Sequence, residues 1–376
     1  MRTPPRTQAT GAVVFALLLL SILVGSSPPA AAAGRYGERL IVDDLSNAVA
    51  FTFAPDDRIF IAERITGNIR VFNPATGALR LFATVPDVVG TVFTELGLDG
   101  IALHPDFPAK PYVYAYVTRD VSGTTRIQII RYEASRGDGT GPGVDPVVIY
   151  QSATPAGPLH VGGRMLFGRD GYLYVVIGDG GTESRAQDLS VERGKILRMT
   201  ARGAPARGNP FGTRVWSFGH RNSFGFDFDP KTGDIWQTEN GPECNDEVNR
   251  ILPGGNYAWG PHQTCSTPPA APANTNQDGP DPRRLPALYF TPTIAPTGLV
   301  FCRDCGLDRA AEGAMFFGSF KGGNIVRATL TSGRRGVDST RLALSHEPRV
   351  LSMEASPRGR LYFSDSNAIY RITSAA

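Results

Sequence analysis

The sequence has little charge, little cysteine and only one long apolar run. Charged residues make up 19% of the 376 residues and the formal net charge is +3, whereas about a quarter of an ordinary globular domain is charged. Such a balanced chain lacks the basic excess of a nucleic-acid-binding protein. The helix-forming residues that a long coiled coil requires are also too sparse. These absences exclude two classes before any motif is considered.

Glycine and proline are abundant instead, with 43 and 30 copies. Hydrophobic residues make up 41%, including 20 Phe and 12 Tyr, which is too apolar for a disordered chain. The length suits two ordinary domains or one large all-β or barrel domain. This density of turn residues favours many short strands joined by tight turns.

Residues 1–33 read as an export signal. Arg2 and Arg6 precede the uncharged apolar stretch 11–24, and small residues at 30–33 offer a cleavage site after Ala33. The stretch is shorter than the roughly 20 residues of a membrane span; the alternative is an uncleaved N-terminal anchor. No later stretch is apolar enough to span a membrane, and the first cysteine is Cys244, which argues against a lipid anchor. We expect an exported protein, periplasmic or secreted, with one mature domain at 34–376.

Export makes disulfides the expected state of the four cysteines. Three pairings are possible, and proximity in the sequence favours Cys244–Cys265 with Cys302–Cys305. The alternative for Cys302 and Cys305 is a redox or metal pair, but no βα pattern of a thioredoxin-type motif surrounds them.

An internal repeat predicts the architecture. Its unit is an apolar strand, a turn rich in Pro, Asp and Gly, and an alternating aromatic strand. Clear copies begin at residues 49, 99, 164, 225 and 353, and a sixth, with its turn replaced by an insertion, is found at 298–301 and 314–318. A further short strand follows each copy, at 68–72, 127–132, 195–199, 248–252, 324–328 and 368–372.

Six antiparallel units of about 57 residues are typical of an all-β, six-bladed β-propeller with four-stranded blades. A pair of β-sandwiches is the alternative, but it does not explain six regular copies. Propellers bind ligands where the blade-entry loops meet around the central channel. Chemistry-bearing residues should therefore lie in those loops.

The third unit predicts a pairing of His160 with Asp179. Residues equidistant from a hairpin turn lie opposite each other, and reflection through the turn at Arg169 and Asp170 takes position 160 to 179. A histidine beside a carboxylate is the arrangement of a base with its orienting partner. The alternative is a structural histidine that only satisfies a hydrogen bond.

The fourth unit places Arg221 opposite Gly241 by the same reflection. Gly241 and Pro242 stand in a carboxylate-rich stretch that includes Glu239, Glu243, Asp246 and Glu247. Carboxylate and carbonyl oxygens suit a hard cation such as Ca²⁺; the alternative is a solvated acidic loop. Arg221, Lys321 and Arg349 belong to loops of three successive units and together would suit an anionic ligand, although any single one is more often just a surface charge.

Nine segments in order along the mature chain carry a family resemblance. They are residues 95–107, 160–164, 177–181, 194–198, 219–222, 239–242, 245–249, 254–259 and 318–323. Through them the chain resembles the soluble glucose, aldose and sorbosone dehydrogenases that depend on pyrroloquinoline quinone (PQQ). That family has a six-bladed propeller, in agreement with the repeat count.

The resemblance implies an oxidoreductase that oxidises the C1 hydroxyl of an aldose by hydride transfer to PQQ, activated by Ca²⁺. His160 would be the base, Asp179 its orienting partner, and Arg221 would stabilise negative charge on the quinone oxygen. Cofactor contacts would come from Glu95, His160, Arg221, Asn222, Lys321 and Arg349. Carbonyls of Gly241 and Pro242 would hold the activating Ca²⁺, while Glu247 and Tyr257, with Asp246 beside them, match a further Ca²⁺ site.

Several positions depart from the glucose enzymes. Glu95 replaces an amide, Leu159 an acid and Leu351 a cofactor arginine, and Ser223-Phe224 replaces Pro-Gln. A carboxylate at 95 repels anionic PQQ unless it is compensated. The departures favour an aldose- or sorbosone-type enzyme over glucose dehydrogenase proper.

Two other functions remain open at this point. One is a Ca²⁺-dependent lactonase on the same propeller, and the other is a non-catalytic propeller that binds sugar or protein. A dehydrogenase would also need an external electron acceptor. We expect a monomer or homodimer with no nucleic-acid partner.

Overall fold

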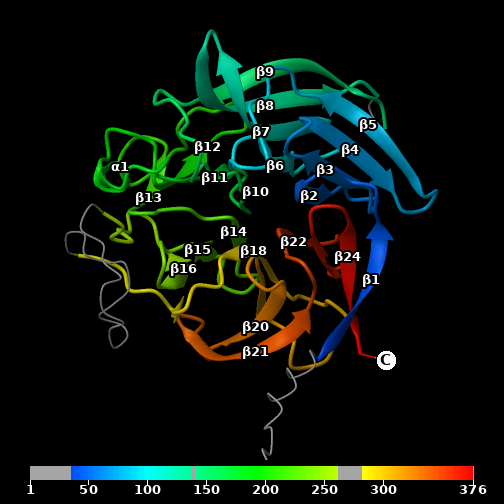
Figure 1. Ribbon diagram of the computed structural model, residues 1–376, viewed down its shortest axis with the longest axis vertical. Coiled ribbons are helices and arrows are strands. Elements are labelled where there is room, and N and C mark those ends of the chain that lie inside the picture. The colour runs from blue at the N-terminus through cyan, green and yellow to red at the C-terminus, as the bar shows by residue number, and fades with distance from the viewer. Residues whose placement is uncertain (1–34, 137–139, 261–281, 376) are drawn as a thin grey trace, which may run out of the picture. The chain divides into compact units, whose positions relative to one another are not determined.

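The computed structural model describes residues 35–136, 140–260 and 282–375. Within these ranges six four-stranded antiparallel sheets are arranged around a common centre (Figure 1). The predicted all-β, six-bladed propeller is therefore confirmed. The predicted signal segment 1–33 and Cys265 lie outside the described residues. The described part of the chain contains no helix long and apolar enough to cross a membrane.

The first three blades follow one another along the chain. Blade one contains β2 (Ala48–Phe53), β3 (Ile59–Glu63), β4 (Asn68–Asn73) and β5 (Ala78–Thr84). Blade two contains β6 (Leu98–Leu103), β7 (Tyr112–Val121), β8 (Thr124–Ala134) and β9 (Gly143–Gln151). Blade three contains β10 (Met165–Phe167), β11 (Leu173–Ile177), β12 (Lys195–Met199) and β13 (Val215–Phe218), with the short helix α1 (Ser184–Gln187) between β11 and β12.

The last three blades complete the ring. Blade four contains β14 (Gly225–Phe228), β15 (Ile235–Glu239), β16 (Asp246–Ile251) and β17 (Leu288–Phe290). Blade five contains β18 (Pro296–Phe301), β19 (Met315–Ser319), β20 (Asn324–Leu330) and β21 (Val337–Ser345). Blade six contains β22 (Ser352–Ala355), β23 (Leu361–Ser364), β24 (Ile369–Ser374) and β1 (Tyr36–Val42).

Inner and outer strands differ in burial because each sheet packs between two neighbours. Every residue of β3, β11, β15 and β19 is buried, as expected for strands covered on both faces. The outer strands β5 and β9 expose much of their length. The apolar repeat in the sequence therefore predicts the inner strands, whereas the outer strands have no clear apolar pattern.

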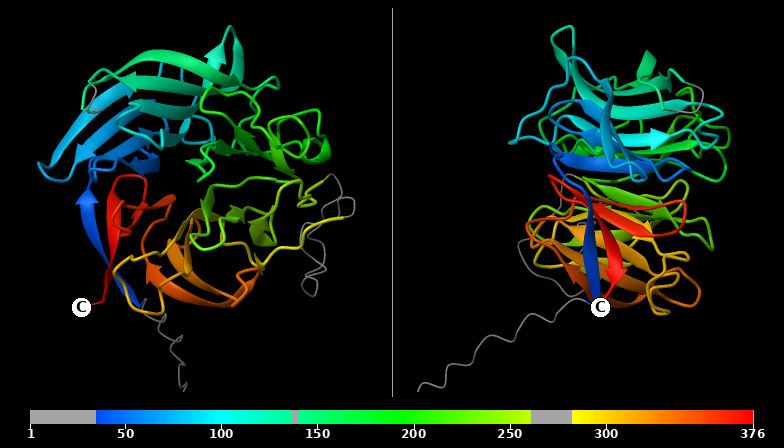
Figure 2. Two further views of the ribbon diagram at one scale, coloured as in Figure 1. Left: turned by 180° about the vertical axis from the view of Figure 1, so that it is seen from behind. Right: turned by 90° about the vertical axis from the view of Figure 1, so that its right-hand side faces the viewer.

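Both ends of the described chain meet in blade six, because β1 pairs with β24 from Tyr36 opposite Ser374 onward (Figure 2). His346 supports this junction between two carboxylates: its Nδ1 lies 2.9 Å from Glu38 of β1, and its Nε2 lies 3.2 Å from Asp365. Burial alone would lower the pKa of His346, but the two carboxylates outweigh burial and raise it.

The unit with the replaced turn forms blade five as predicted. Val300 of β18 pairs with Phe316 of β19, and the insertion between them contains the Cys302–Cys305 disulfide. That predicted disulfide is confirmed, whereas the predicted Cys244–Cys265 bond involves a residue outside the described ranges. The insertion adds a covalent loop without changing the pairing of the blade.

Candidate functional site

A cavity of about 580 Å³ lies where the six blade-entry loops converge. Most of its lining residues come from the segments that lead into β2, β6, β10, β14, β18 and β22, and the others come from the loops that follow β3, β15, β19 and β23. The volume falls in the range of about 300–1,000 Å³ that is usual for small-molecule sites. The expectation that functional residues gather in these loops agrees with this placement.

His160 and Asp179 meet at the wall of the cavity. His160 Nδ1 lies 2.7 Å from Asp179 Oδ1, and Asp179 is completely buried. The observed strand register differs by one residue from the predicted one. Met165 pairs with Val175, so the main chain of His160 lies opposite Gly180 and not opposite Asp179. His160 also has a φ of 55°, a strained conformation that tends to occur at functional sites.

Three donors hold the Asp179 carboxylate. Besides His160, the Gly181 N–H donates to Oδ1 at 2.7 Å and the Trp259 indole N–H donates to Oδ2 at 2.8 Å. Trp259 is buried and follows β16 in blade four, so the next blade helps to orient the pair. Trp259 had no predicted role, although it stands in one of the segments that carry the family resemblance.

Gly178 permits the close approach of two site loops. A Cβ at this position would lie 2.3 Å from the His160 carbonyl oxygen and 2.9 Å from that of Arg221. Contacts below 3.0 Å with backbone atoms cannot be relieved by a side-chain rotation. Only glycine therefore lets the two main-chain segments reach β11 together.

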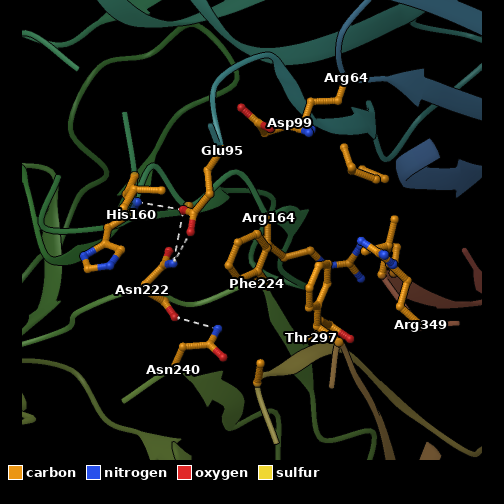
Figure 3. Close-up of a pocket in the computed structure, with 18 of the residues that line it drawn as sticks. Arg64, Glu95, Asp99, His160, Arg164, Asn222, Phe224, Asn240, Thr297 and Arg349 are labelled. Carbon is orange, nitrogen blue, oxygen red and sulfur yellow. Dashed lines mark hydrogen bonds between the residues drawn. The ribbon is translucent and has the colours of Figure 1, made fainter. Parts of the chain in front are cut away.

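Glu95 bridges His160 and Asn222 (Figure 3). One of its carboxylate oxygens accepts a hydrogen bond from the His160 main-chain N–H at 2.6 Å, and the Asn222 amide lies 3.1 Å from both oxygens. These neutral donors stabilise the carboxylate by hydrogen bonding, and the Arg221 guanidinium is close enough to attract its charge. The structure thus supplies local compensation for the charge that was expected to repel an anionic cofactor.

Arg221 and Asn222 are held by Glu239. One Glu239 oxygen accepts both of their main-chain N–H groups, at 3.1 and 2.5 Å, while the other lies 3.1 Å from His220 Nδ1. Arg221 donates to the Asn240 carbonyl, and its guanidinium lies 5.2 Å from the centre of the Trp259 ring. Burial lowers the pKa of Arg221, against the attraction of nearby carboxylates.

Lys321 and Arg349 also line the cavity wall. Lys321 Nζ donates to the Thr293 hydroxyl at 2.5 Å, and the Arg349 guanidinium lies 4.5 Å from the centre of the Phe320 ring. With Arg221 they form the three predicted cations, and all three line one cavity. The departures Leu159, Phe224 and Leu351 line it as well.

Three further charged residues in the cavity wall had no predicted role. Arg164 donates to Glu354 at 2.7 Å. Arg64 and Asp99 lie near each other in the upper part of the close-up (Figure 3). Asp99 Oδ2 is buried without a hydrogen-bond partner among the described residues, and burial raises the pKa of this carboxyl well above its usual range. In the sequence, Arg164 and Asp99 stand in segments that carry the family resemblance. Arg64 stands in none of them, so no pattern indicated it.

The five predicted metal residues divide into two groups. Gly241, Pro242 and Asp246 line the cavity, whereas Glu247 and Tyr257 do not. Asp246 accepts hydrogen bonds from the main-chain N–H groups of Gly241, Ile294 and Ala295 at 2.6–2.8 Å. Both of its oxygens are therefore used to join two loops. Burial raises the pKa of Asp246.

Glu247 and Tyr257 are engaged elsewhere in blade four. Glu247 accepts a hydrogen bond from the Asn249 side chain at 3.0 Å. The Tyr257 hydroxyl bonds to the main chain at Arg250 and Leu252, and its ring stacks on His220. Over the described ranges, no three His, Cys, Asp or Glu side chains are grouped to hold a metal.

Comparisons with known proteins identify the family of the chain. The family model "Glucose / Sorbosone dehydrogenase" matches residues 45–373. The chain is 30% identical to quinoprotein glucose dehydrogenase B of Acinetobacter calcoaceticus over 60% of this chain and 52% of that protein, so this match spans about half of the relative. It is 26% identical to an aldose sugar dehydrogenase of Escherichia coli over 92% of this chain and 94% of that one.

A solved structure shows the same relationship in three dimensions. The PQQ-bound aldose sugar dehydrogenase of Streptomyces coelicolor superposes with a TM-score of 0.75 at 28% identity, covering 92% of this chain and 99% of that one. The family match spans nearly all of the described propeller, including every loop of the cavity. The chain belongs to the glucose/sorbosone dehydrogenase family.

Proposed function

We propose that the chain is a PQQ-dependent aldose sugar dehydrogenase that oxidises the C1 hydroxyl of the sugar. The observation that carries this proposal is the His160–Asp179 pair in the wall of a cavity that three cations also line. A base with a buried orienting carboxylate suits removal of a hydroxyl proton. The cations suit a multiply anionic cofactor.

Unpaired polar atoms support a fit between this cavity and PQQ. Arg221 Nε and Asn222 Oδ1 are buried without a hydrogen-bond partner among the described residues, and both residues line the cavity. Buried polar atoms usually find partners, so a ligand with oxygen acceptors and a donor would complete them. When bound, PQQ supplies a quinone that accepts the hydride of the sugar.

The residues of the chain would supply proton transfer and placement. Because His160 Nδ1 is bonded to Asp179, its Nε2 is the nitrogen that accepts the proton of the sugar hydroxyl. Asp179 holds the ring and stabilises the cation that results. Arg221 places a positive charge where negative charge develops, while Lys321 and Arg349 would bind carboxylates of the cofactor. Asn222 and Glu95 would contact the cofactor while they fix the His160 main chain.

We further propose that Ca²⁺ binds at the Gly241–Pro242 turn through main-chain carbonyls. The buried Asn240 side-chain oxygen beside this turn has no hydrogen-bond donor in the described part of the chain, and oxygen is the ligand that Ca²⁺ prefers. Asp246 would act through its hydrogen bonds to the loops, and the further site at Glu247 and Tyr257 stays a prediction. The cation would polarise the bound cofactor.

The decisive experiment is reconstitution. Purified apoprotein receives PQQ and CaCl₂, and dye reduction is followed with a panel of aldoses. We expect turnover that requires both additions. His160→Gln should lower kcat by about 10²–10⁴-fold, the usual contribution of a general base, while His104→Gln, which changes a histidine outside the cavity, should retain activity. No PQQ binding and no reduction across the panel would refute the proposal.

Export and assembly stay parts of the same proposal. Residues 1–33 would be removed as a signal peptide, so that a single propeller domain functions in the periplasm or outside the cell. It would pass electrons to an external acceptor as a monomer or homodimer. N-terminal sequencing of the secreted protein tests the cleavage, and a mature chain that still begins at Met1 would contradict it.

A further inference from the structure

The central cavity has exposed apolar side chains at its opening. Val92, Phe93, Leu159 and Phe320 all line the cavity, and each is between 44% and 89% exposed. A single exposed hydrophobic residue on a protein surface needs no explanation, but several at one opening are typical of a binding site. Phe93 is the most exposed of the four, so its ring is available to a ligand.

Phe93 stands on a closed turn in the segment between β5 and β6. The Thr94 main-chain N–H donates to the Thr91 carbonyl at 3.3 Å, and the Phe93 N–H donates to the Thr91 hydroxyl at 3.2 Å. A Cβ at Gly90 would lie 2.6 Å from the Leu96 carbonyl oxygen, so the two ends of the turn meet. The main chain that carries Phe93 is therefore held in place, while its side chain stands in solvent.

The same turn is joined to the loop that carries the proposed base. The Glu95 main-chain N–H donates to the Pro158 carbonyl at 2.9 Å, and the Glu95 carboxylate accepts the His160 main-chain N–H at 2.6 Å (Figure 3). Glu95 follows Phe93 by two residues, which span at most about 7 Å. This length is comparable to one sugar ring. A second ring attached to a sugar at His160 would therefore come within reach of Phe93.

The cavity wall and its opening suit different parts of one ligand. The wall near His160 is polar, with the buried Asn222 and the partly buried Arg221, whereas Leu159 and Phe93 make the opening apolar. The C1 hydroxyl of a substrate sugar has to lie at His160, so any further sugar unit has to project through the opening. The faces of sugar rings carry C–H groups, and the negative face of an aromatic ring attracts them.

We propose that Phe93 determines specificity by stacking on the second ring of a reducing disaccharide or longer sugar. This inference rests on the proposed dehydrogenase function. The first ring would present its C1 hydroxyl to His160, while the second would leave the cavity across Phe93 and Val92. This contact would remove apolar surface of the aromatic ring from water, which favours binding of the longer sugar. Phe93 takes no part in the reaction at C1.

The test compares aldoses with their own disaccharides in the reconstituted enzyme: glucose with maltose and cellobiose, and xylose with xylobiose. Phe93→Ala should raise KM for the disaccharides by about three- to tenfold, as expected for loss of one aromatic contact, and leave KM for glucose and xylose unchanged. Phe93→Trp should restore the disaccharide KM. Leu81→Ala, which changes an exposed apolar residue outside the cavity, should alter neither. Equal changes for both classes of sugar, no change for any, or an unmodified enzyme that accepts aldoses but no disaccharide overturns the inference.

Saturation-transfer NMR with excess cellobiose separates this inference from the proposed function. The protein is mixed with PQQ and CaCl₂ but with no dye, so that the measurement reports binding and not turnover. Protons of the non-reducing ring should receive saturation from the unmodified protein and lose most of it in Phe93→Ala. If no sugar is oxidised in the dye assay, the dehydrogenase proposal fails and this comparison alone decides the Phe93 contact. Equal saturation of that ring by both proteins overturns it.

Discussion

Replacing Trp259 by Phe removes a single hydrogen-bond donor from the buried Asp179 carboxylate. The indole N–H donates to Asp179 Oδ2 at 2.8 Å, and Asp179 is completely buried, so water does not replace the lost donor. A hydrogen bond to a charged group contributes about 1.5–3 kcal/mol to stability. Loss of ring volume adds a cavity cost of its own, which a control variant must remove from the comparison.

Trp236 provides that control within the same chain. It is also fully buried, but its indole nitrogen has no acceptor among the described residues. Trp236→Phe loses the same atoms without losing a hydrogen bond. We therefore expect Trp259→Phe to lower the free energy of unfolding by about 1.5–3 kcal/mol more than Trp236→Phe does.

Urea unfolding of both apoprotein variants, followed by far-UV circular dichroism, measures this difference. The comparison holds if the dependence of free energy on urea is the same in both variants. Equal destabilisation would refute the reasoning, because it would mean that the Trp259 hydrogen bond adds nothing to the Asp179 site. With reconstituted enzyme, Trp259→Phe should lower kcat more than it changes KM, because in the proposed function Asp179 orients the base and does not bind the sugar.

Three further predictions follow from contacts in the described structure. Gly178→Ala should cost about 1–3 kcal/mol or more of stability in thermal unfolding, since its Cβ would overlap the His160 carbonyl; unchanged stability would contradict the close approach. Asp179→Asn should lower kcat by about 10²–10⁴-fold in the dye assay, and near-normal turnover would remove Asp179 from the mechanism. The raised pKa of His346 means that its ion pairs stabilise the fold below its ordinary pKa of 6.5 and lose this effect as pH rises through the raised value; urea unfolding should show His346→Gln destabilised by about 1–3 kcal/mol more at pH 5.5 than at high pH, and an equal loss at both would speak against it.

The fold was readable from the sequence because the inner strands repeat a strong pattern. The strands of each hairpin are close in sequence, and burial on both faces makes them continuously apolar. The outer strands carry no such pattern, and neither does the pairing of β1 with β24, which joins the two ends of the described chain. That pairing depends on closure of the ring, which no local signal expresses.

The candidate site was predictable only where its partners share one hairpin. His160 and Asp179 flank the same turn, so reflection through that turn brought them together with an error of one residue in register. Trp259 reaches Asp179 from 80 positions away, and Glu239 supports two main-chain N–H groups that only the folded loop aligns.

The sequence alone determined the repeat number and the pairing of the inner strands of each blade, and it favoured the Cys302–Cys305 bond and the approach of His160 to Asp179. These features depend on short-range periodicity and on spacing about a turn. Tertiary structure decided which side chains of different blades converge and how the charge of Glu95 is compensated. Such properties arise from burial and from contacts between distant segments, and both exist only once the ring has closed.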